Sequence, residues 1–441
     1  MRLAADPPSC YSSAANNALS GDDCMNDVTA GTALDLEFVR AQFPAFAEPS
    51  LQGQAFFENA GGSYACGPVV QRLYEYYRRL KVQPYYVFAA SAEAGEWMDA
   101  ARQRLAEYLG TSPESVHFGP STSQNTYVLA QAFRALLQPG DEIIVTNQDH
   151  EANSGAWRRL MSHGVTVREW CVDPERGTLD LAQLERLLSR RTRLVAFPHA
   201  SNVVAHINPV AEISARAHAV GALSIVDGVA WAPHGLPDVR SLGADIYLFS
   251  LYKTYGPHQG LMVVRPELLA RLANESHYFN AHETRKRLVP AGPDHAQVAA
   301  ARGIAEYFDA LDAHHHAGGA PDGRPERVRA LLRGAELPLL RTLLAALERR
   351  SDIRLLGPAV AEQRAATVAF VPHKLAPAEL GRRLAARGFM VGYGDFYAVR
   401  VLQALGVDLA QGAVRFSLLH YTSAAEVAGL IAALEESLRA G

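Results

Sequence analysis

The sequence predicts an open, mostly parallel α/β sheet accompanied by a smaller C-terminal lobe. Three short apolar runs, at residues 194–197, 224–226 and 246–249, each precede polar side chains and are separated by segments with helical periodicity. Runs that are apolar throughout are typical of strands buried on both faces of a parallel sheet. Such sheets place their ligand crevice beyond the carboxyl ends of the strands. The polar residues after these runs are therefore the first candidates for a functional site.

The composition indicates an ordinary soluble chain with small-molecule partners. Its 441 residues, of which 49% are hydrophobic, suffice for a large domain and a smaller one. A net charge of -4 gives no electrostatic basis for binding nucleic acid or an anionic membrane. No apolar run approaches the ~20 residues that a membrane helix needs. We therefore expect a cytoplasmic protein.

The cysteines predict neither disulfide bonds nor a zinc site. Cys10, Cys24, Cys66 and Cys171 have no C-x-x-C spacing, and the N-terminus lacks the apolar core of a secretory leader. We expect reduced thiols. Residues 1–34 are rich in Ala, Ser, Asn and Asp and predict a disordered extension, to which we assign no function.

An acid and a lysine follow two of the predicted strands. Asp227 directly follows the run at 224–226, and Lys253 lies in a small polar turn after the run at 246–249. Both should meet over one crevice. Pyridoxal 5′-phosphate (PLP) uses such a pair, because the lysine amine forms a Schiff base and the carboxylate keeps the pyridine nitrogen protonated. Taken alone the pair is a weak signal, since acids and lysines in such places are commonly surface charges.

The residues around the lysine strengthen this interpretation. Ser250 and Tyr252 are hydroxyl donors suited to a phosphate, and the Gly-Pro turn that ends at Gly260 lets backbone approach a ligand. Together, D-G-V-A, S-L-Y-K and G-P-H-Q-G within residues 224–264 resemble the class V aminotransferase and cysteine desulfurase family of fold type I. The resemblance begins near Leu36 and implies PLP, a homodimer, and a large domain with a mostly parallel seven-stranded sheet beside a smaller α+β domain.

The resemblance also divides the chain into segments. After the N-terminal extension we expect a segment at 35–70 that packs on the small domain, and then the large PLP-binding domain at 71–290. A connecting helix and loop at 291–325 should lead to the small C-terminal domain at 326–441. Three histidines at 314–316 predict a surface loop; a metal cluster is the alternative, without a second group at ligand spacing.

Two further stretches match the cofactor-binding residues of the family. Thr122 and Ser123 lie at a predicted helix start, where free backbone N–H groups bind anions, and match its phosphate turn. An ordinary helix cap is the alternative. His150 follows a predicted strand at 142–146 and, with Asn153, matches the family's H-x-x-N, whose histidine stacks on the cofactor ring. A capping or partly buried histidine is the alternative.

The resemblance also implies substrate-binding residues. Asn202 matches an asparagine that reaches the cofactor's phenolic oxygen or the substrate carboxylate. Asn59 and Ala60 match a turn near that carboxylate; a plain loop without ligand contact is an equally good interpretation of this turn. Arg415 matches the arginine that clamps the α-carboxylate; the alternative is a salt-bridged strand residue. His206 is either an acid or base or a polar residue of the crevice wall.

The sequence departs from the cysteine desulfurases at their nucleophile. Tyr397 stands where the catalytic cysteine of a G-x-x-C-A loop would lie, and the C-terminal half contains no cysteine. Persulfide chemistry needs a positioned thiolate. Ala230 also replaces the desulfurase glutamine. The chain thus resembles the branch without the cysteine, including the decarboxylating aldolase of fungal ustiloxin biosynthesis, which removes a side-chain carboxyl group and joins the enamine to an aldehyde.

We therefore predict a PLP-dependent enzyme that acts on an α-amino acid by β-elimination or β-decarboxylation, with or without addition to an aldehyde acceptor. Lys253 would form the Schiff base and move the Cα proton, while Asp227 keeps the ring cationic and His150 holds it in place. A class V aminotransferase would use the same residues, and a non-catalytic PLP-fold protein is the third alternative. Side-chain specificity is expected near Tyr85, His206, His282 and Tyr397.

Overall fold

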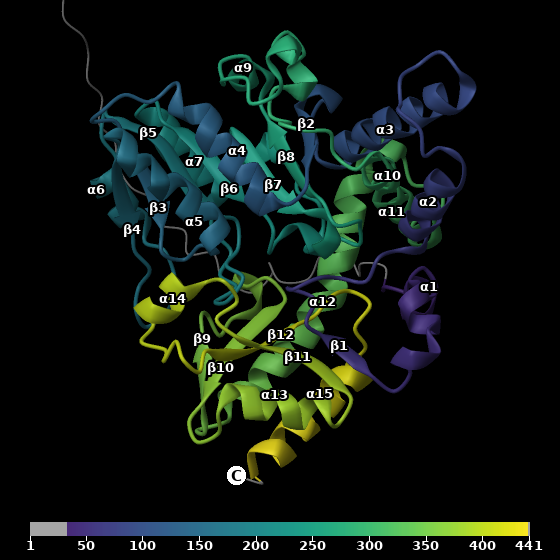
Figure 1. Ribbon diagram of the computed structural model, residues 1–441. Coiled ribbons are helices and arrows are strands. Elements are labelled where there is room, and N and C mark those ends of the chain that lie inside the picture. Colours follow the sequence, from purple (N-terminus) through teal and green to yellow (C-terminus); the bar gives the residue numbers. More distant parts are fainter. Residues whose placement is uncertain (1–32, 440–441) are drawn as a thin grey trace, which may run out of the picture.

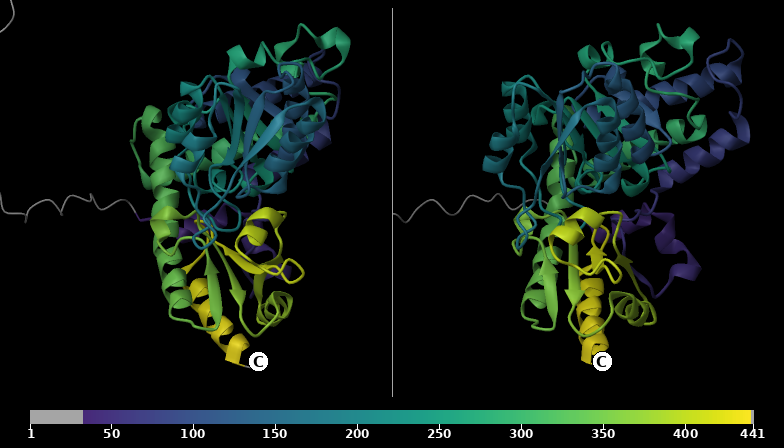
Figure 2. Two further views of the ribbon diagram at one scale, coloured as in Figure 1. Left: turned by 90° about the vertical axis from the view of Figure 1, so that its left-hand side faces the viewer. Right: turned by 60° about the vertical axis from the view of Figure 1, so that its left-hand side comes forward.

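A computed structural model describes residues 33–439, which form a large and a small domain (Figure 1). Most of the predicted N-terminal extension, with Cys10 and Cys24, lies outside the described residues. The large sheet occupies the upper half of Figure 1 and the small sheet the lower half, and α12 (Arg324–Glu348) runs along both. The two turned views of Figure 2 show the same arrangement.

The large domain contains a seven-stranded sheet in the order β2-β8-β7-β6-β5-β3-β4. Only β8 runs antiparallel to its neighbours. The predicted fold class is therefore confirmed. The strands are β2 (Val116–Gly119), β3 (Glu142–Thr146), β4 (Thr166–Trp170), β5 (Thr192–Pro198), β6 (Leu223–Asp227), β7 (Ile246–Ser250) and β8 (Gly260–Val264).

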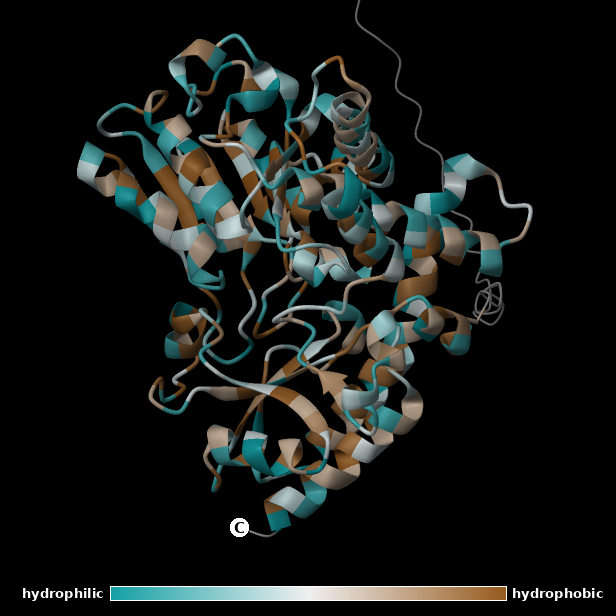
Figure 3. Ribbon diagram, turned by 45° about the vertical axis from the view of Figure 1, so that its right-hand side comes forward, coloured by the Kyte–Doolittle hydropathy of each residue, from teal (hydrophilic) through white to brown (hydrophobic). Residues whose placement is uncertain are grey.

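Helices cover both faces of this sheet, because its strands are apolar on both sides. Ile143 and Val145 of β3 join one core with side chains of α4 and α5, whereas Ile144 between them joins a second core with side chains of α7, α10 and α11. Figure 3 shows brown, hydrophobic strands at the centre of the domain and teal patches on the surrounding helices. The helices are α2 (Gly67–Arg79), α3 (Ala89–Tyr108), α4 (Thr122–Arg134), α5 (Glu151–Arg158), α6 (Leu181–Leu187), α7 (Val210–Ala219), α8 (Val239–Leu242), α9 (Pro266–Leu269), α10 (His295–Ala300) and α11 (Arg302–His315).

The small domain joins the two ends of the described chain. Its sheet has the order β1-β11-β12-β10-β9, and β1 pairs in parallel with β11, so that Ala55 lies opposite Phe389. The residue after β1, Glu58, bridges to Ser417 of β12. The elements are α1 (Leu36–Ala41), β1 (Ala55–Phe57), β9 (Ile353–Leu356), β10 (Thr367–Pro372), α13 (Pro377–Ala385), β11 (Phe389–Gly394), α14 (Val399–Ala404), β12 (Ala413–Ser417) and α15 (Ala424–Arg439).

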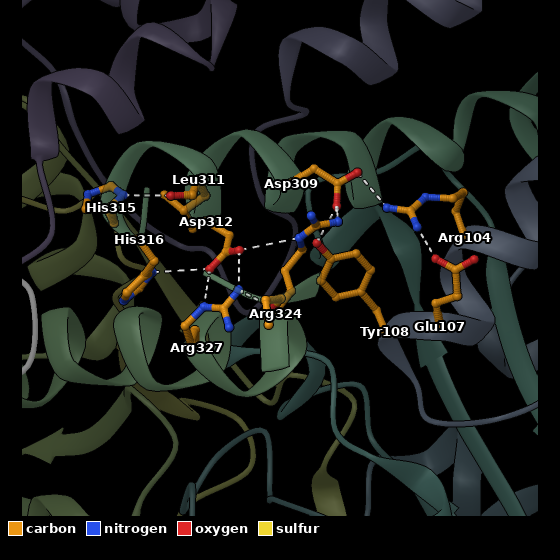
Figure 4. Close-up of polar contacts among 11 residues, drawn as sticks. Arg104, Glu107, Tyr108, Asp309, Leu311, Asp312, His315, His316, Arg324 and Arg327 are labelled. Carbon is orange, nitrogen blue, oxygen red and sulfur yellow. Dashed lines mark hydrogen bonds and ion pairs between the residues drawn. The ribbon is translucent and has the colours of Figure 1, made fainter. Parts of the chain in front are cut away.

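The prediction of a surface loop at residues 314–316 is wrong at its start, because α11 continues to His315. Contacts with α1 and the residue before it stabilise the last turn of α11. The His314 ring stacks on Phe38 with 3.9 Å between ring centroids, and its Nε2 lies 2.9 Å from Asp35 Oδ2. His316 caps the helix and lies 3.2 Å from Asp312 (Figure 4). Within residues 33–439 no group of three potential metal ligands is present.

Asp309 and Asp312 of α11 form an ion-pair network with neighbouring helices (Figure 4). Asp312 accepts hydrogen bonds from Arg324 and Arg327 of α12, and Asp309 accepts from Arg324 and from Tyr108 Oη of α3 at 2.8 Å. These contacts fasten α12 to the large domain. None of the helices between residues 33 and 439 is long and apolar enough to span a membrane.

Candidate active site

The ends of β6 and β7 bring the predicted acid and lysine together. β6 ends at Asp227, and a short turn after β7 carries Lys253. Because β6 and β7 are adjacent and parallel, both residues line one cavity at the carboxyl edge of the sheet. The other predicted cofactor residues line the same cavity: Thr122, Ser123, His150, Asn202, Ser250 and Tyr252.

Burial shifts the two ionisable groups in opposite directions. Burial, reinforced by the nearby Arg415 cation, lowers the pKa of Lys253 to about 8, so a neutral amine is readily available. Burial raises the pKa of Asp227 to about 6, although a hydrogen bond of 2.9 Å from the Val229 backbone N–H opposes this rise. At neutral pH the carboxylate is mostly ionised, as a partner for a protonated ring nitrogen must be.

A candidate anion cradle lies at the start of α4. The Ser121 side chain caps the helix by accepting from the Gln124 N–H at 3.2 Å, and the hydroxyls of Thr122 and Ser250 are 2.8 Å apart. Helix starts carry backbone N–H groups without intrahelical partners. A Cβ atom on Gly260 would lie 2.4 Å from the Thr122 nitrogen, so only glycine allows β8 to pack this closely behind the cradle.

His150 caps a helix and lines the cavity, and its stacking on a cofactor ring stays a prediction. Its Nδ1 accepts from the Ala152 N–H at 3.1 Å and thereby caps α5, while the ring also lines the cavity. Burial, together with the cations Lys253 and Arg415, lowers the pKa of His150 to about 4. The ring is therefore neutral near pH 7. Tyr397 lies close to it, with ring centroids 5.6 Å apart.

Arg415 of β12, in the small domain, contacts the lining residue Asn202 but does not itself line the cavity. Its Nη1 donates to the Asn202 carbonyl at 3.1 Å, its Nη2 pairs with Glu58, and its guanidinium lies over the Phe396 ring at 4.1 Å. The Arg415 Nε is buried and has no hydrogen-bond partner among the described residues. The arginine is therefore a paired strand residue with one buried donor unused among the described residues, and its binding of a substrate carboxylate stays a prediction.

The Asn59–Ala60 turn lies beside Lys253, in a smaller recess. The Asn59 amide donates to the Ser417 carbonyl at 2.8 Å and accepts from Tyr421 Oη, and the Ala60 N–H donates to Ser417 Oγ at 2.8 Å. The Asn59 side chain thus holds the turn against β12. Ligand contact through this turn remains a prediction.

None of the four predicted specificity residues lines the main cavity, although Tyr397 lies beside the lining residue His150. His206 is half-buried, and its Nδ1 lies 3.1 Å from Asn208 Oδ1. Tyr85 and His282 are exposed, and neither is among the lining residues of that cavity.

Sequence reasoning missed Glu58 and Phe396. The Phe396 carbonyl accepts from Asn202 Nδ2 at 2.9 Å, while Asn202 Oδ1 remains buried without a partner among the described residues. A buried arginine needs hydrogen-bond acceptors, which are either backbone carbonyls or an acidic side chain, so an acidic residue was one expected partner of Arg415. Glu58 is the acidic residue that immediately precedes the predicted substrate turn, Asn59–Ala60, and was therefore the first candidate for a partner of Arg415.

The cavity residues fit PLP. They offer a helix start with hydroxyl groups for a phosphate, a buried acid for a ring nitrogen, and a buried amine with a lowered pKa. The orphaned Asn202 oxygen adds an acceptor for a ligand donor. Fold and cavity together define a PLP-dependent enzyme of fold type I.

Comparison with known proteins identifies the family. The model of the family described as Aminotransferase class-V matches residues 55–285 and 333–430. "Aminotransferase-like protein FGM3" from Gibberella zeae is 32% identical over 92% of this chain and 98% of its own length. A "Probable cysteine desulfurase" from Pseudomonas aeruginosa is 32% identical over 90% of this chain and 97% of its own length. The chain belongs to the class V aminotransferase family, whose members use PLP.

A solved structure shows the same fold. The apo cysteine desulfurase from Thermococcus onnurineus NA1 superposes with a TM-score of 0.81, at 24% identity, over 94% of this chain and all of its own. At this identity the likeness concerns the fold alone. The predicted family, cofactor and enzyme class are confirmed by the family match.

Proposed function

We propose that this enzyme acts on an α-amino acid by β-elimination or β-decarboxylation and that it does not form a protein-bound persulfide. The observation that carries this proposal is that Tyr397, which the resemblance matches to the desulfurase cysteine, lies beside His150. The two described cysteines do not line the cavity. Cys66 is buried at the start of α2, and burial raises the pKa of its thiol to about 12. β-Chemistry needs no second nucleophile from the protein.

In this proposal the cavity residues divide the work of binding and proton transfer. The α4 start with Thr122 and Ser123 would hold the phosphate, and Asp227 would hold the ring nitrogen. Bound PLP supplies an electron sink for negative charge at the substrate Cα. Lys253 would bind the cofactor and afterwards carry the Cα proton, for which a pKa near neutrality is suited. The neutral His150 ring would fix the plane of the cofactor.

The small domain would bind the substrate. Arg415 would bind the α-carboxylate through the donors that its protein partners leave free. Tyr397 would contact the substrate side chain, or an aldehyde acceptor, because it lies next to His150 and is exposed. His206, Tyr85 and His282 would influence specificity at most from outside the main cavity. Unchanged kinetics of a His206→Ala variant with every substrate would remove that residue from the list.

A class V aminotransferase is the alternative, favoured by the printed name of the Gibberella zeae relative. It would use the same residues and would return the proton to the cofactor. A non-catalytic role is less well supported, since the lysine, the acid, the histidine and the arginine are all in place.

Product analysis separates these alternatives. The PLP-loaded protein is incubated with L-cysteine, cysteine sulfinate, L-aspartate or L-alanine, with Lys253→Ala protein as the control. We expect catalytic release of pyruvate, sulfide, sulfinate or CO₂ from one of them, and none from the control. Conversion of the cofactor to its pyridoxamine form in a single stoichiometric step, without such release, would contradict the lyase and support the aminotransferase.

We also propose a homodimer, which the family resemblance implies. A group of exposed aromatic side chains on α2 and the following loop supports it, and these residues are Tyr74, Tyr77, Tyr85, Tyr86 and Phe88. Light scattering coupled to size-exclusion chromatography should give twice the chain mass. A monomer at micromolar concentration would contradict this part of the proposal.

A further inference from the structure

Arg415 has a carboxylate partner within the protein, Glu58. Glu58 follows β1, and its Oε1 pairs with the Arg415 guanidinium. The Glu58 side chain is 29% exposed, whereas that of Arg415 is 4% exposed. The Arg415 guanidinium is therefore enclosed by the protein. The Glu58 carboxylate reaches solvent and can move when a ligand binds.

Two glycines form a recess that the Glu58 carboxylate fills. A Cβ atom on Gly61 would lie 1.9 Å from Glu58 Oε2, and one on Gly392 would lie 2.8 Å from Oε1. Gly392 lies directly opposite Arg415 in the pairing of β11 with β12. The missing Cβ atoms at these two positions leave the space that the Glu58 carboxylate occupies beside the arginine.

The remaining donors of Arg415 lie next to this acid. Its Nη1 is shared with the Asn202 carbonyl, one face is covered by the Phe396 ring, and Nε has no partner among residues 33–439. A ligand carboxylate that binds these donors comes close to the Glu58 carboxylate, and like charges at short range in a buried site repel strongly.

Among the described residues, no arginine lines the cavity or its smaller recess, and Arg415 itself reaches the site only through its contacts with Asn202 and Glu58. The basic side chains among the described lining residues are Lys253, His150 and His234. Lys253 is assigned to the cofactor, and His150 is neutral because its pKa is lowered to about 4. A second carboxylate on a substrate bound through Arg415 would therefore meet Glu58, and no arginine in the lining of the cavity would offset that charge.

We propose that Glu58 is a specificity-determining residue that competes with the substrate α-carboxylate for Arg415 and disfavours substrates with a second carboxylate. The inference rests on the proposed function only in assigning Arg415 to the substrate carboxylate. Glu58 would weaken the binding of all amino acids and that of dicarboxylic ones most, so that of the two proposed reactions it favours β-elimination, whose substrate needs no second carboxylate, over β-decarboxylation. A purely structural partner of Arg415 would have the opposite effect when removed, because the guanidinium would lose its position.

The test uses carboxylates without an amino group, which cannot react with the cofactor. Propionate and succinate are titrated into the PLP-loaded wild-type protein and the Glu58→Gln variant, and dissociation constants are measured by ligand-observed NMR. We expect the variant to bind propionate about tenfold more tightly, because one repelling charge is removed while the side-chain shape is kept. The gain for succinate should be larger than the gain for propionate.

Glu306→Gln is the matched control. Glu306 also pairs with an arginine, Arg72, and its side chain is 27% exposed, close to the value for Glu58. It lies in α11, away from the cavity, so its substitution should leave both dissociation constants unchanged. Arg415→Lys should weaken propionate binding, which assigns the measured binding to this site.

Unchanged or weaker binding by a folded Glu58→Gln protein would overturn the inference. If this variant does not fold, as judged by its thermal midpoint, Glu58→Ala replaces it and should also bind propionate more tightly. The outcomes separate the inference from the proposed function. Tighter binding without turnover of any amino acid would leave the inference standing and contradict the function, and turnover without tighter binding would do the reverse.

Discussion

Two buried arginines of the small domain differ in how their donors are used. Arg364 is completely buried, and its donors go to the backbone carbonyls of Thr367, Leu356 and Pro358. Arg415 is almost as buried, yet it has a single backbone carbonyl, one acidic partner and a buried Nε without a partner among the described residues. A structural arginine is satisfied by the fold, whereas an arginine with spare donors is prepared for a ligand.

The largest effect on activity should follow substitution of the unsatisfied arginine. Arg415→Lys keeps the charge and loses the planar fork that binds a carboxylate through two hydrogen bonds, so kcat/KM should fall about 100-fold or more. Arg364→Lys should leave kcat/KM of the folded protein within about twofold. Steady-state kinetics of both variants checks the contrast, and equal losses would remove the distinction between the two residues.

The largest effect on stability should follow substitution of the satisfied arginine. Arg364→Met leaves buried carbonyls without donors, and the free energy of unfolding should fall by about 3 kcal/mol. Arg415→Met should cost less, because fewer carbonyls lose a donor. Urea denaturation of the cofactor-free proteins measures both. A greater loss at Arg415 would show that its role is mainly structural.

The lowered pKa of Lys253 should make the stability of the cofactor-free protein depend on pH. The pKa of the lysine amine falls from an ordinary value of 10.5 to about 8 in the folded protein. Between these values the unfolded chain binds a proton that the folded chain does not, so this residue makes stability rise with pH over that window. Lys253→Met should abolish this contribution in the cofactor-free protein. Urea midpoints at several pH values, compared between the two proteins, test it; identical curves would contradict the lowered pKa.

The smallest effect is expected far from the cavity, in the ion-pair network of Figure 4. Asp312→Asn weakens contacts with Arg324 and Arg327, whose side chains are partly exposed, and should cost about 1 kcal/mol of stability. It should leave kcat/KM unchanged. A loss of activity larger than the loss of folded protein would show that α12 couples this network to the site.

Most of the large domain could be predicted from the sequence because its strands and the polar residues after them show as short patterns along the chain. Apolar runs define the strands, and the residues that follow them, such as Asp227 and Lys253, must gather at one sheet edge. The helix start at Thr122 and Ser123 was predicted for the same reason, since a helix start after a strand is a short-range pattern, whereas their assignment to a phosphate came from the resemblance and stays a prediction. The resemblance to the family then supplied the seven-stranded sheet and the cofactor.

The missed features depend on contacts between distant segments. Glu58 reaches Arg415 only because β1 pairs with β11, more than 300 residues away along the chain. Phe396 joins the site because its loop crosses from the small domain to Asn202. The loop expected at His314 became helical because Phe38 and Asp35 contact that residue. No local pattern at these positions carries such information.

The central claim is that the cavity binds PLP covalently through Lys253, and one measurement tests it directly. The purified protein is incubated with PLP and reduced with borohydride, and its peptides are analysed by mass spectrometry, with Lys253→Ala as the control. The account predicts a reduced pyridoxyl adduct on Lys253 in the wild-type protein and no stoichiometric adduct in the variant. An unmodified Lys253 in folded, PLP-treated wild-type protein, or a stoichiometric adduct on another lysine, would contradict the account.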